Sequence, residues 1–114
     1  MRIGLIGYGK MGKAIEKVAM DRGHTISFKT DNCTVNLIKD IDIAIEFSTP
    51  ESAFTNIKNC LNNSIPIVTG TTGWLDNLDN IEELCGQRNG SFLYASNFSL
   101  GANIFFELNK KLAL

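Results

Sequence analysis

The sequence has no excess of either charge, no closely spaced cysteines and no long apolar run. Its 11 basic and 12 acidic side chains give a formal charge of −1, which argues against binding to nucleic-acid backbones or anionic membrane surfaces. Three distant cysteines, Cys33, Cys60 and Cys85, include no C-x-x-C pair, and no charged leader precedes the first apolar residues. Charges such as Lys10 and Glu16 interrupt the early sequence too often for a membrane span. We therefore expect a cytoplasmic protein with no nucleic-acid or membrane partner.

The composition is that of one globular domain. Apolar residues make up 44% of the 114 residues, an ordinary fraction for a folded protein. A chain of this length buries roughly two thirds of its unfolded surface, which supports one core and one principal site. That is too little for a cofactor domain and a full substrate domain together, so we interpret residues 1–114 as a single domain.

Short apolar runs alternate with segments of helical periodicity. The runs that predict strands are residues 2–7, 24–30, 42–47, 65–69 and 91–96. Apolar stripes predict helices over Met11 to Ala19, Ala53 to Leu61 and Trp74 to Cys85, with one helical turn at 35–39 and a last helix from near Ala102. Helices between successive strands imply crossover connections, so the pattern predicts the α/β class, with a doubly wound parallel sheet covered on both faces.

The predicted last helix has no stop signal. Ile104, Leu108 and Leu112 continue an apolar stripe without a glycine or other cap. We interpret the chain as truncated before a substrate domain; the alternative is a frayed C-terminal helix docked on the sheet.

A glycine pattern follows the first predicted strand and opens the first predicted helix. Residues 7–12 read G-Y-G-K-M-G, which fits the Rossmann-type dinucleotide-binding pattern G-x-G-x-x-G. The first glycine permits a tight turn, the second lets the backbone approach a pyrophosphate, and the third lets the helix pack on the strand. The alternative is a glycine-rich turn that binds no ligand.

Asp31 stands nineteen residues after Gly12, at the end of the second predicted strand. An acid at this place accepts hydrogen bonds from the adenosine ribose, which favours NAD. Because Asp31 and Asn32 are also a good turn pair, an ordinary turn aspartate is the alternative.

Hydroxyl and glycine residues follow the third and fourth predicted strands. Phe47-Ser48-Thr49 and Gly70-Thr71-Thr72-Gly73 both lie where the crevice of a parallel sheet forms, and Ser96-Asn97-Phe98-Ser99 closes the fifth strand in the same row. We expect these loops to face the nicotinamide half of the cofactor. Helix capping is the alternative role of Thr49 and Thr72.

Four motifs in this order, G-Y-G-K-M-G, E-F-S-T-P-E, G-T-T-G-W and S-N-F-S-L-G-A-N, together resemble the N-terminal half of the dihydrodipicolinate reductase (4-hydroxy-tetrahydrodipicolinate reductase) family. The resemblance covers essentially the whole sequence. It implies the following cofactor-binding residues: Gly7, Tyr8, Gly9, Lys10, Met11 and Gly12 at the pyrophosphate; Asp31 at the ribose; and Phe47, Ser48, Gly70, Thr71, Thr72, Ala95, Ser96, Asn97 and Phe98 at the nicotinamide.

The sequence departs from that family in two places. The family often has an arginine after the acid, for the 2′-phosphate of NADP, whereas this chain has Asn32, with Lys29 as the nearby cation. We therefore expect NADH to bind at least as well as NADPH. The family's histidine pair and lysine, which bind substrate and donate a proton, have no match; the sole histidine, His24, fits a surface or strand-edge role. We assign no catalytic residue and no metal site within these residues.

Three functions compete on this basis. The first, favoured by the ordered motifs, is the NAD(P)H-binding half of an oxidoreductase that reduces a cyclic dicarboxylate in the diaminopimelate route to lysine and forms a homo-oligomer at full length. The second is a non-catalytic NAD(H) sensor or regulatory module. The third, an aspartate or homoserine dehydrogenase, shares only the glycine pattern.

Overall fold

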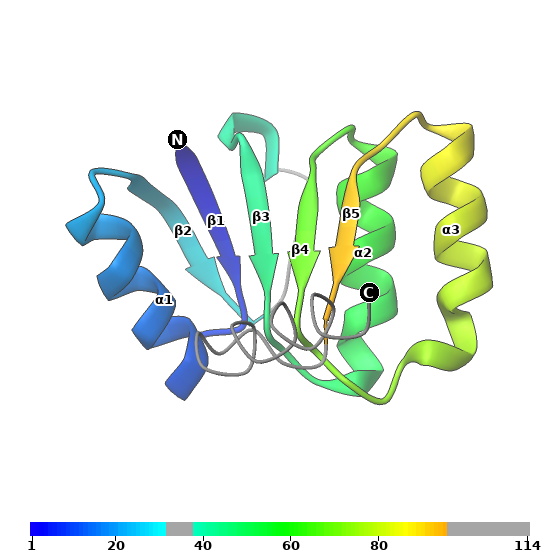
Figure 1. Ribbon diagram of the computed structural model, residues 1–114, viewed down its shortest axis with the longest axis horizontal. Coiled ribbons are helices and arrows are strands. Elements are labelled where there is room, and N and C mark those ends of the chain that lie inside the picture. Colours follow the sequence, from blue (N-terminus) through cyan, green and yellow to red (C-terminus); the bar gives the residue numbers. More distant parts are fainter. Residues whose placement is uncertain (32–37, 96–114) are drawn as a thin grey trace, which may run out of the picture.

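The computed structural model describes residues 1–31 and 38–95, which form a five-stranded parallel sheet in the order β2-β1-β3-β4-β5 with helices beside it (Figure 1). The strands are β1 (Arg2–Ile6), β2 (Thr25–Thr30), β3 (Ile43–Glu46), β4 (Ile67–Thr69) and β5 (Phe92–Tyr94). The helices are α1 (Lys10–Asp21), α2 (Pro50–Asn62) and α3 (Leu78–Gln87), with 3-10 turns η1 (Ile38–Asp40) and η2 (Leu75–Asn77). The predicted α/β fold with a parallel sheet is confirmed.

Helices lie on both faces of this sheet. Leu5 of β1 packs in a cluster with Ala19 of α1, whereas the next residue, Ile6, belongs to the larger cluster with Ile57 of α2 and Ile81 of α3. Successive side chains of a strand point to opposite faces, so α1 covers one face and α2 and α3 cover the other. The sheet is therefore doubly wound, as the alternating pattern predicts.

The strand order reverses direction between β1 and β3. From β1 the chain passes through α1 to β2 on one side, and from β3 it passes through α2 and α3 to β4 and β5 on the other. In open α/β sheets, ligands bind outside the carboxyl ends of the strands at such a switch point. The turns after β1 and β3 are therefore the first place to look for a site.

Local signals fix the start of α2 beside this point. Thr49 is the N-cap and accepts a hydrogen bond from the Ser52 N–H at 3.3 Å, Pro50 occupies the first turn, and Glu51 lies in the same turn. These features confirm the helix start that the sequence predicts. The residues predicted to face the core are fully buried: Ala53, Ile57, Cys60 and Leu61.

The start of α3 differs from the prediction. Trp74 was expected to open this helix, but it precedes η2, and α3 begins at Leu78. The Trp74 ring is nevertheless 2% exposed and packs edge-on against Phe92 and Tyr94. The helical spacing of Trp74 and Leu78 thus arises because both residues pack in the same core, not because they belong to one continuous helix.

Several expectations fall outside the described residues. These are the full helical turn at 35–39, of which η1 covers the end, and the last helix with Ile104, Leu108 and Leu112. Within the described residues, Cys60 is buried and Cys85 is partly buried. None of the described helices combines the length and the apolar character that a membrane span needs.

Candidate functional site

The glycine turn between β1 and α1 has the geometry that its pattern predicts. Gly7 has a φ of +93°, and a Cβ atom there would lie 2.0 Å from the carbonyl oxygen of Phe47. A Cβ atom at Gly12 would lie 2.5 Å from the Gly7 oxygen, whereas one at Gly9 would meet no atom of the described residues within 4 Å. The first and third glycines thus serve turn formation and packing, and the second leaves space beside the backbone.

The helix that follows has an uncapped N-terminus. Gly9 is the N-cap of α1 and makes no side-chain capping bond, and the first turn contains no acidic residue. The first N–H groups of a helix have no intrahelical acceptor, and together with the helix dipole they favour an anion. This terminus therefore fits a pyrophosphate group.

Asp31 lies directly after β2 and beside the same turn. Its Oδ1 accepts a hydrogen bond from the Tyr8 N–H at 3.2 Å, and the Gly7 N–H donates to the carbonyl oxygen of Thr30 at 2.6 Å. The structure thus brings the predicted ribose acid to the glycine turn, although the two are far apart in sequence.

Charged groups surround the Tyr8 side chain. Its hydroxyl donates to Glu16 at 2.5 Å, and the Lys29 ammonium lies 2.8 Å from Glu16 and 4.8 Å from the centre of the Tyr8 ring. The Lys29 contact, followed by the Tyr8 hydroxyl, lowers the pKa of Glu16, and hydrogen bonding to Glu16 raises the pKa of both partners. Lys13 lies 5.8 Å from the same ring, a second cation that sequence spacing did not identify.

A pocket of about 340 Å³ connects this turn with the loops after β3 and β4. Its lining contains eight predicted residues and one that was not predicted, Pro50: the eight are Gly9, Lys10, Met11, Phe47, Ser48, Gly70, Thr71 and Thr72. The Phe47 ring lies so close to Gly70 that a Cβ atom there would meet it at 2.1 Å. The structure therefore gathers both halves of the predicted site around one cavity.

Thr72 does not cap a helix, because the residue that precedes η2 is Trp74 and the one that precedes α3 is Asn77. Capping is thus the role of Thr49 but not of Thr72. Ala95 directly follows β5, and its N–H donates to the Thr69 oxygen at 3.3 Å. Ser96, Asn97 and Phe98 lie outside the described residues.

Comparison with known protein families matches residues 1–98 to the family described as "Dihydrodipicolinate reductase, N-terminus". The chain belongs to the dihydrodipicolinate reductase family. It is 52% identical, over 99% of its length, to 4-hydroxy-tetrahydrodipicolinate reductase of Christiangramia forsetii, and 32% identical, over 90% of its length, to the enzyme of the same name from Staphylococcus epidermidis. It covers 48% and 46% of those proteins, so it spans about half the length of these relatives.

Solved structures share the fold of this reductase-family chain at low sequence identity. An Archaeoglobus fulgidus protein assigned as a homoserine dehydrogenase superposes with a TM-score of 0.69 at 14% identity, covering 82% of this chain and 42% of its own. A hyperthermophilic archaeal homoserine dehydrogenase in complex with NADPH gives 0.63, also at 14% identity and over 82% and 43% of the two chains. These likenesses concern the fold alone, so the family match decides against a homoserine dehydrogenase.

Sequence reasoning also missed the carboxyl group of Glu46. This residue ends β3, is completely buried, and accepts hydrogen bonds from Ser48, Thr69 and Thr71. The available signal was an acid inside the otherwise apolar run I-A-I-E-F, because a buried carboxyl group requires hydrogen-bond partners.

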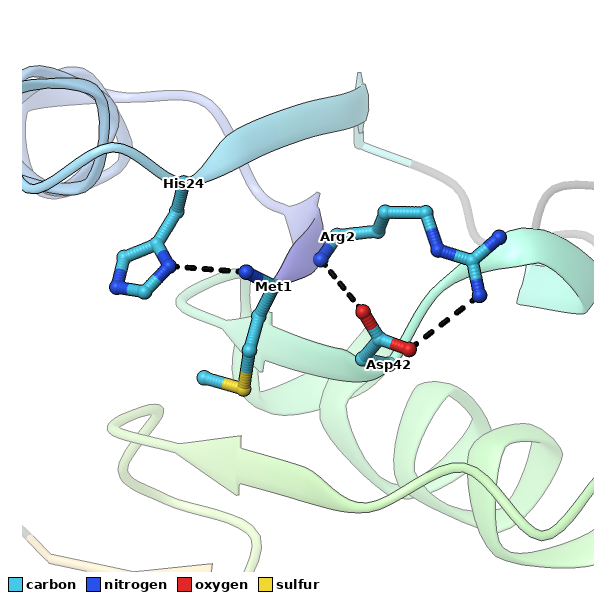
Figure 2. A network of polar contacts seen from close by, with 4 residues as sticks. All are labelled: Met1, Arg2, His24 and Asp42. Carbon is cyan, nitrogen blue, oxygen red and sulfur yellow. Dashed lines mark hydrogen bonds and ion pairs between the residues drawn. The ribbon is translucent and has the colours of Figure 1, made fainter.

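The opposite edge of the sheet, where the strands have their amino ends, holds a separate set of polar contacts (Figure 2). The Met1 amine lies 3.1 Å from the His24 Nδ1, and Asp42 accepts hydrogen bonds from the Arg2 backbone at 2.7 Å and from its guanidinium at 3.3 Å. His24 therefore lies at the amino ends of the strands, away from the pocket, as a strand-edge histidine would. Within residues 1–31 and 38–95, no group of three His, Cys, Asp or Glu side chains could hold a metal.

Proposed function

We propose that this chain is the NAD(P)H-binding part of a 4-hydroxy-tetrahydrodipicolinate reductase of the cytoplasm. The observation that carries the proposal is the uncapped N-terminus of α1, with open space at Gly9, at the switch point of a chain that belongs to this family. The single domain over residues 1–114 is part of the same proposal.

The residues present fit a dinucleotide. Backbone N–H groups from Gly9 onward would bind the pyrophosphate, and Asp31, beside the Tyr8 N–H, would accept hydrogen bonds from the ribose. The loops that contain Phe47 and Thr71 would bound the nicotinamide side. Once bound, the cofactor would supply a hydride for a cyclic imine or ene-amine dicarboxylate.

The Lys29 environment favours NADH over NADPH within this proposal. Lys29 is the cation that could offset repulsion between Asp31 and a 2′-phosphate, but its ammonium pairs with Glu16 at 2.8 Å. The Glu16 carboxylate would therefore compete with the 2′-phosphate of NADPH for the Lys29 ammonium. We expect NADH to bind at least as well as NADPH, and Asp31→Ala to narrow any gap between them.

Gly9→Ala tests the cofactor site. The added methyl group meets no atom within 4 Å in the part of the chain that the structure describes, so the melting temperature should stay within a few degrees, while the NADH dissociation constant should rise at least about tenfold. Calorimetric titration beside thermal melts measures both quantities. Equal NADH affinity in two equally folded proteins would overturn the assignment.

Turnover tests the extent of the active site. Hydride transfer also needs a bound substrate and a proton donor, and the family's histidine and lysine segment has no match in this sequence. We expect no steady NADH oxidation when this chain is mixed with freshly generated dihydrodipicolinate. Oxidation that scales with its concentration would show a complete active site within residues 1–114.

The family match does not favour a non-catalytic sensor, because both relatives named above are reductases. The substrate and the homo-oligomer of the whole enzyme belong to the proposal, since the chain spans about half of those relatives.

A further inference from the structure

Glu46 is a buried acid that makes no contact with the cofactor in the proposed site. It ends β3 with no exposed surface, and its register partner Ile6 on β1 is a core residue. Burial of an acidic side chain is costly unless hydrogen bonds satisfy it. The partners of Glu46 should therefore show why an acid occupies this place.

Three hydroxyl groups donate to the Glu46 carboxyl. Thr69 and Thr71 donate to its Oε1 at 2.5 Å and 2.6 Å, and Ser48 donates to its Oε2. Ser48 belongs to the loop after β3, and Thr71 belongs to the loop after β4. One carboxyl group thus joins both loops that line the pocket.

Each of these hydroxyls also accepts a hydrogen bond from a nitrogen. The Ser48 N–H donates to the Thr71 Oγ at 2.8 Å, the Thr71 N–H donates to the Thr69 Oγ at 3.2 Å, and the Asn56 amide donates to the Ser48 Oγ at 3.4 Å. A hydroxyl has one proton to donate, and here Glu46 receives it from all three. The Ser48 and Thr71 side chains consequently have no proton left for a ligand.

The same contacts fix the backbone of the two loops. The Ser48 and Thr71 N–H groups donate within the network, and the Trp74 indole binds the Thr71 carbonyl oxygen at 2.6 Å. The loop positions, rather than the hydroxyl protons, then determine the shape that the pocket offers. The acid at the centre determines those loop positions.

We propose that Glu46 is a positioning residue for the nicotinamide half of the cofactor, acting through Ser48 and Thr71. This inference rests on the proposed NAD(P)H site. The pyrophosphate and ribose positions belong to the β1–α1 turn and Asp31, and no hydrogen bond joins Glu46 to either of them within the described residues. Disturbing Glu46 should therefore weaken binding of the nicotinamide half only.

Glu46→Gln, titrated with NADH and with ADP-ribose, separates the two halves. The amide keeps the size of the side chain but points hydrogens at one of the donating hydroxyls, which must turn away. We expect the NADH dissociation constant to rise about tenfold, the effect of roughly one hydrogen bond, while that of ADP-ribose changes less than twofold. Glu46→Asp, which keeps the charge but shortens the reach, should show the same selectivity and replaces the amide variant if that variant fails to fold.

Two further variants distinguish positioning from stability. Ile57 is buried on α2 and lies outside the network. Ile57→Val should lower the melting temperature and leave the ratio of the two dissociation constants unchanged. If Glu46 acts through Thr71, both substitutions break the same hydrogen bond between these two side chains. The double variant Glu46→Gln/Thr71→Val should then lose no more NADH affinity than the single variant that binds NADH more weakly.

Equal losses for NADH and ADP-ribose, or no loss for either, would overturn the role of Glu46 while leaving the cofactor site in place. An unaltered chain that bound neither ligand would overturn the proposed function, and this inference with it.

Discussion

Two turns at the carboxyl edge of the sheet each lead from a strand into a helix, and they are built in opposite ways. The turn after β1 has glycines at both ends, Gly7 and Gly9, and leaves the N-terminus of α1 without a side-chain cap. The turn after β3 uses side chains, because Ser48 binds Glu46 and Thr49 caps α2. Their backbones are in close contact, with the Phe47 oxygen beside Gly7.

The N-terminus of α1 leaves backbone N–H donors without a side-chain acceptor, whereas at the N-terminus of α2 a side chain of the turn accepts from one of these donors. Thr49 satisfies an N–H group of α2, and Glu51 in the first turn of that helix would repel an anion. Lys10 begins α1, and no acid follows in its first turn. Of these two neighbouring helix ends, only that of α1 suits a pyrophosphate, and the other helps to hold the loop beside it.

The largest effect should come from Gly7→Ala. Alanine disfavours a φ of +93°, and its methyl group would lie 2.0 Å from the Phe47 backbone oxygen, so the turns would have to separate. We expect a loss of roughly 3 kcal/mol or more in the free energy of unfolding, measured by urea denaturation. Gly9→Ala is the matched control, since among residues 1–31 and 38–95 its methyl group has no neighbour within 4 Å. Similar stability in the two variants would refute the described contact between the turns.

Thr49→Ala should lower the free energy of unfolding by about 1 kcal/mol through loss of the α2 cap. The NADH dissociation constant should stay within about twofold, because α2 does not donate to the cofactor in our proposal. Thr49→Ser retains the hydroxyl and serves as the control for both measurements. A loss of NADH affinity as large as that of Gly9→Ala would mean that both helix ends bind the cofactor.

Glu16→Gln should alter cofactor preference by a smaller amount. Removing this carboxylate releases Lys29 from its 2.8 Å ion pair at the edge of the glycine turn. We expect NADPH affinity to rise about threefold relative to NADH, the range expected of a partly exposed charge pair. Glu82→Gln makes the same charge change on an exposed site of α3 and should leave the ratio unchanged. An unchanged ratio in Glu16→Gln would show that Lys29 does not reach the 2′-phosphate.

The fold and the glycine turn could be predicted because their signals are local or periodic. Each glycine role depends on neighbouring backbone, and a parallel sheet brings the carboxyl ends of its strands to one edge whatever the loops contain. Phe47, Gly70 and Thr71 could therefore be placed together before their contacts were known.

The Glu46 network could not be predicted in the same way. Its threonine partners stand 23 and 25 residues further along the chain, and apolar patterning treats one acid in a strand as an interruption. The predicted start of a helix at Trp74 is wrong for a related reason, since periodicity indicates which residues are buried and not which backbone conformation buries them.

The opposite edge of the sheet provides the smallest and last test. There Asp42 is already paired with Arg2 (Figure 2), whereas at the carboxyl edge the N-terminus of α1 has no side-chain cap. The Arg2 backbone N–H and then its guanidinium lower the pKa of Asp42. A carboxyl group whose pKa is lower in the folded state contributes stability above its unfolded pKa and loses it as the pH falls through the folded value.

Urea midpoints measured from about pH 5 to pH 2 should thus fall less steeply in Asp42→Asn than in the unaltered chain. The difference should be small, because the Arg2 and Asp42 side chains are 56% and 43% exposed. NADH affinity at neutral pH should be the same in both proteins, since this pair lies at the edge away from the pocket. Identical pH profiles would show that the Arg2 contacts do not stabilise the ionised carboxylate. Weaker NADH binding in Asp42→Asn would show that the two edges of the sheet are coupled rather than independent.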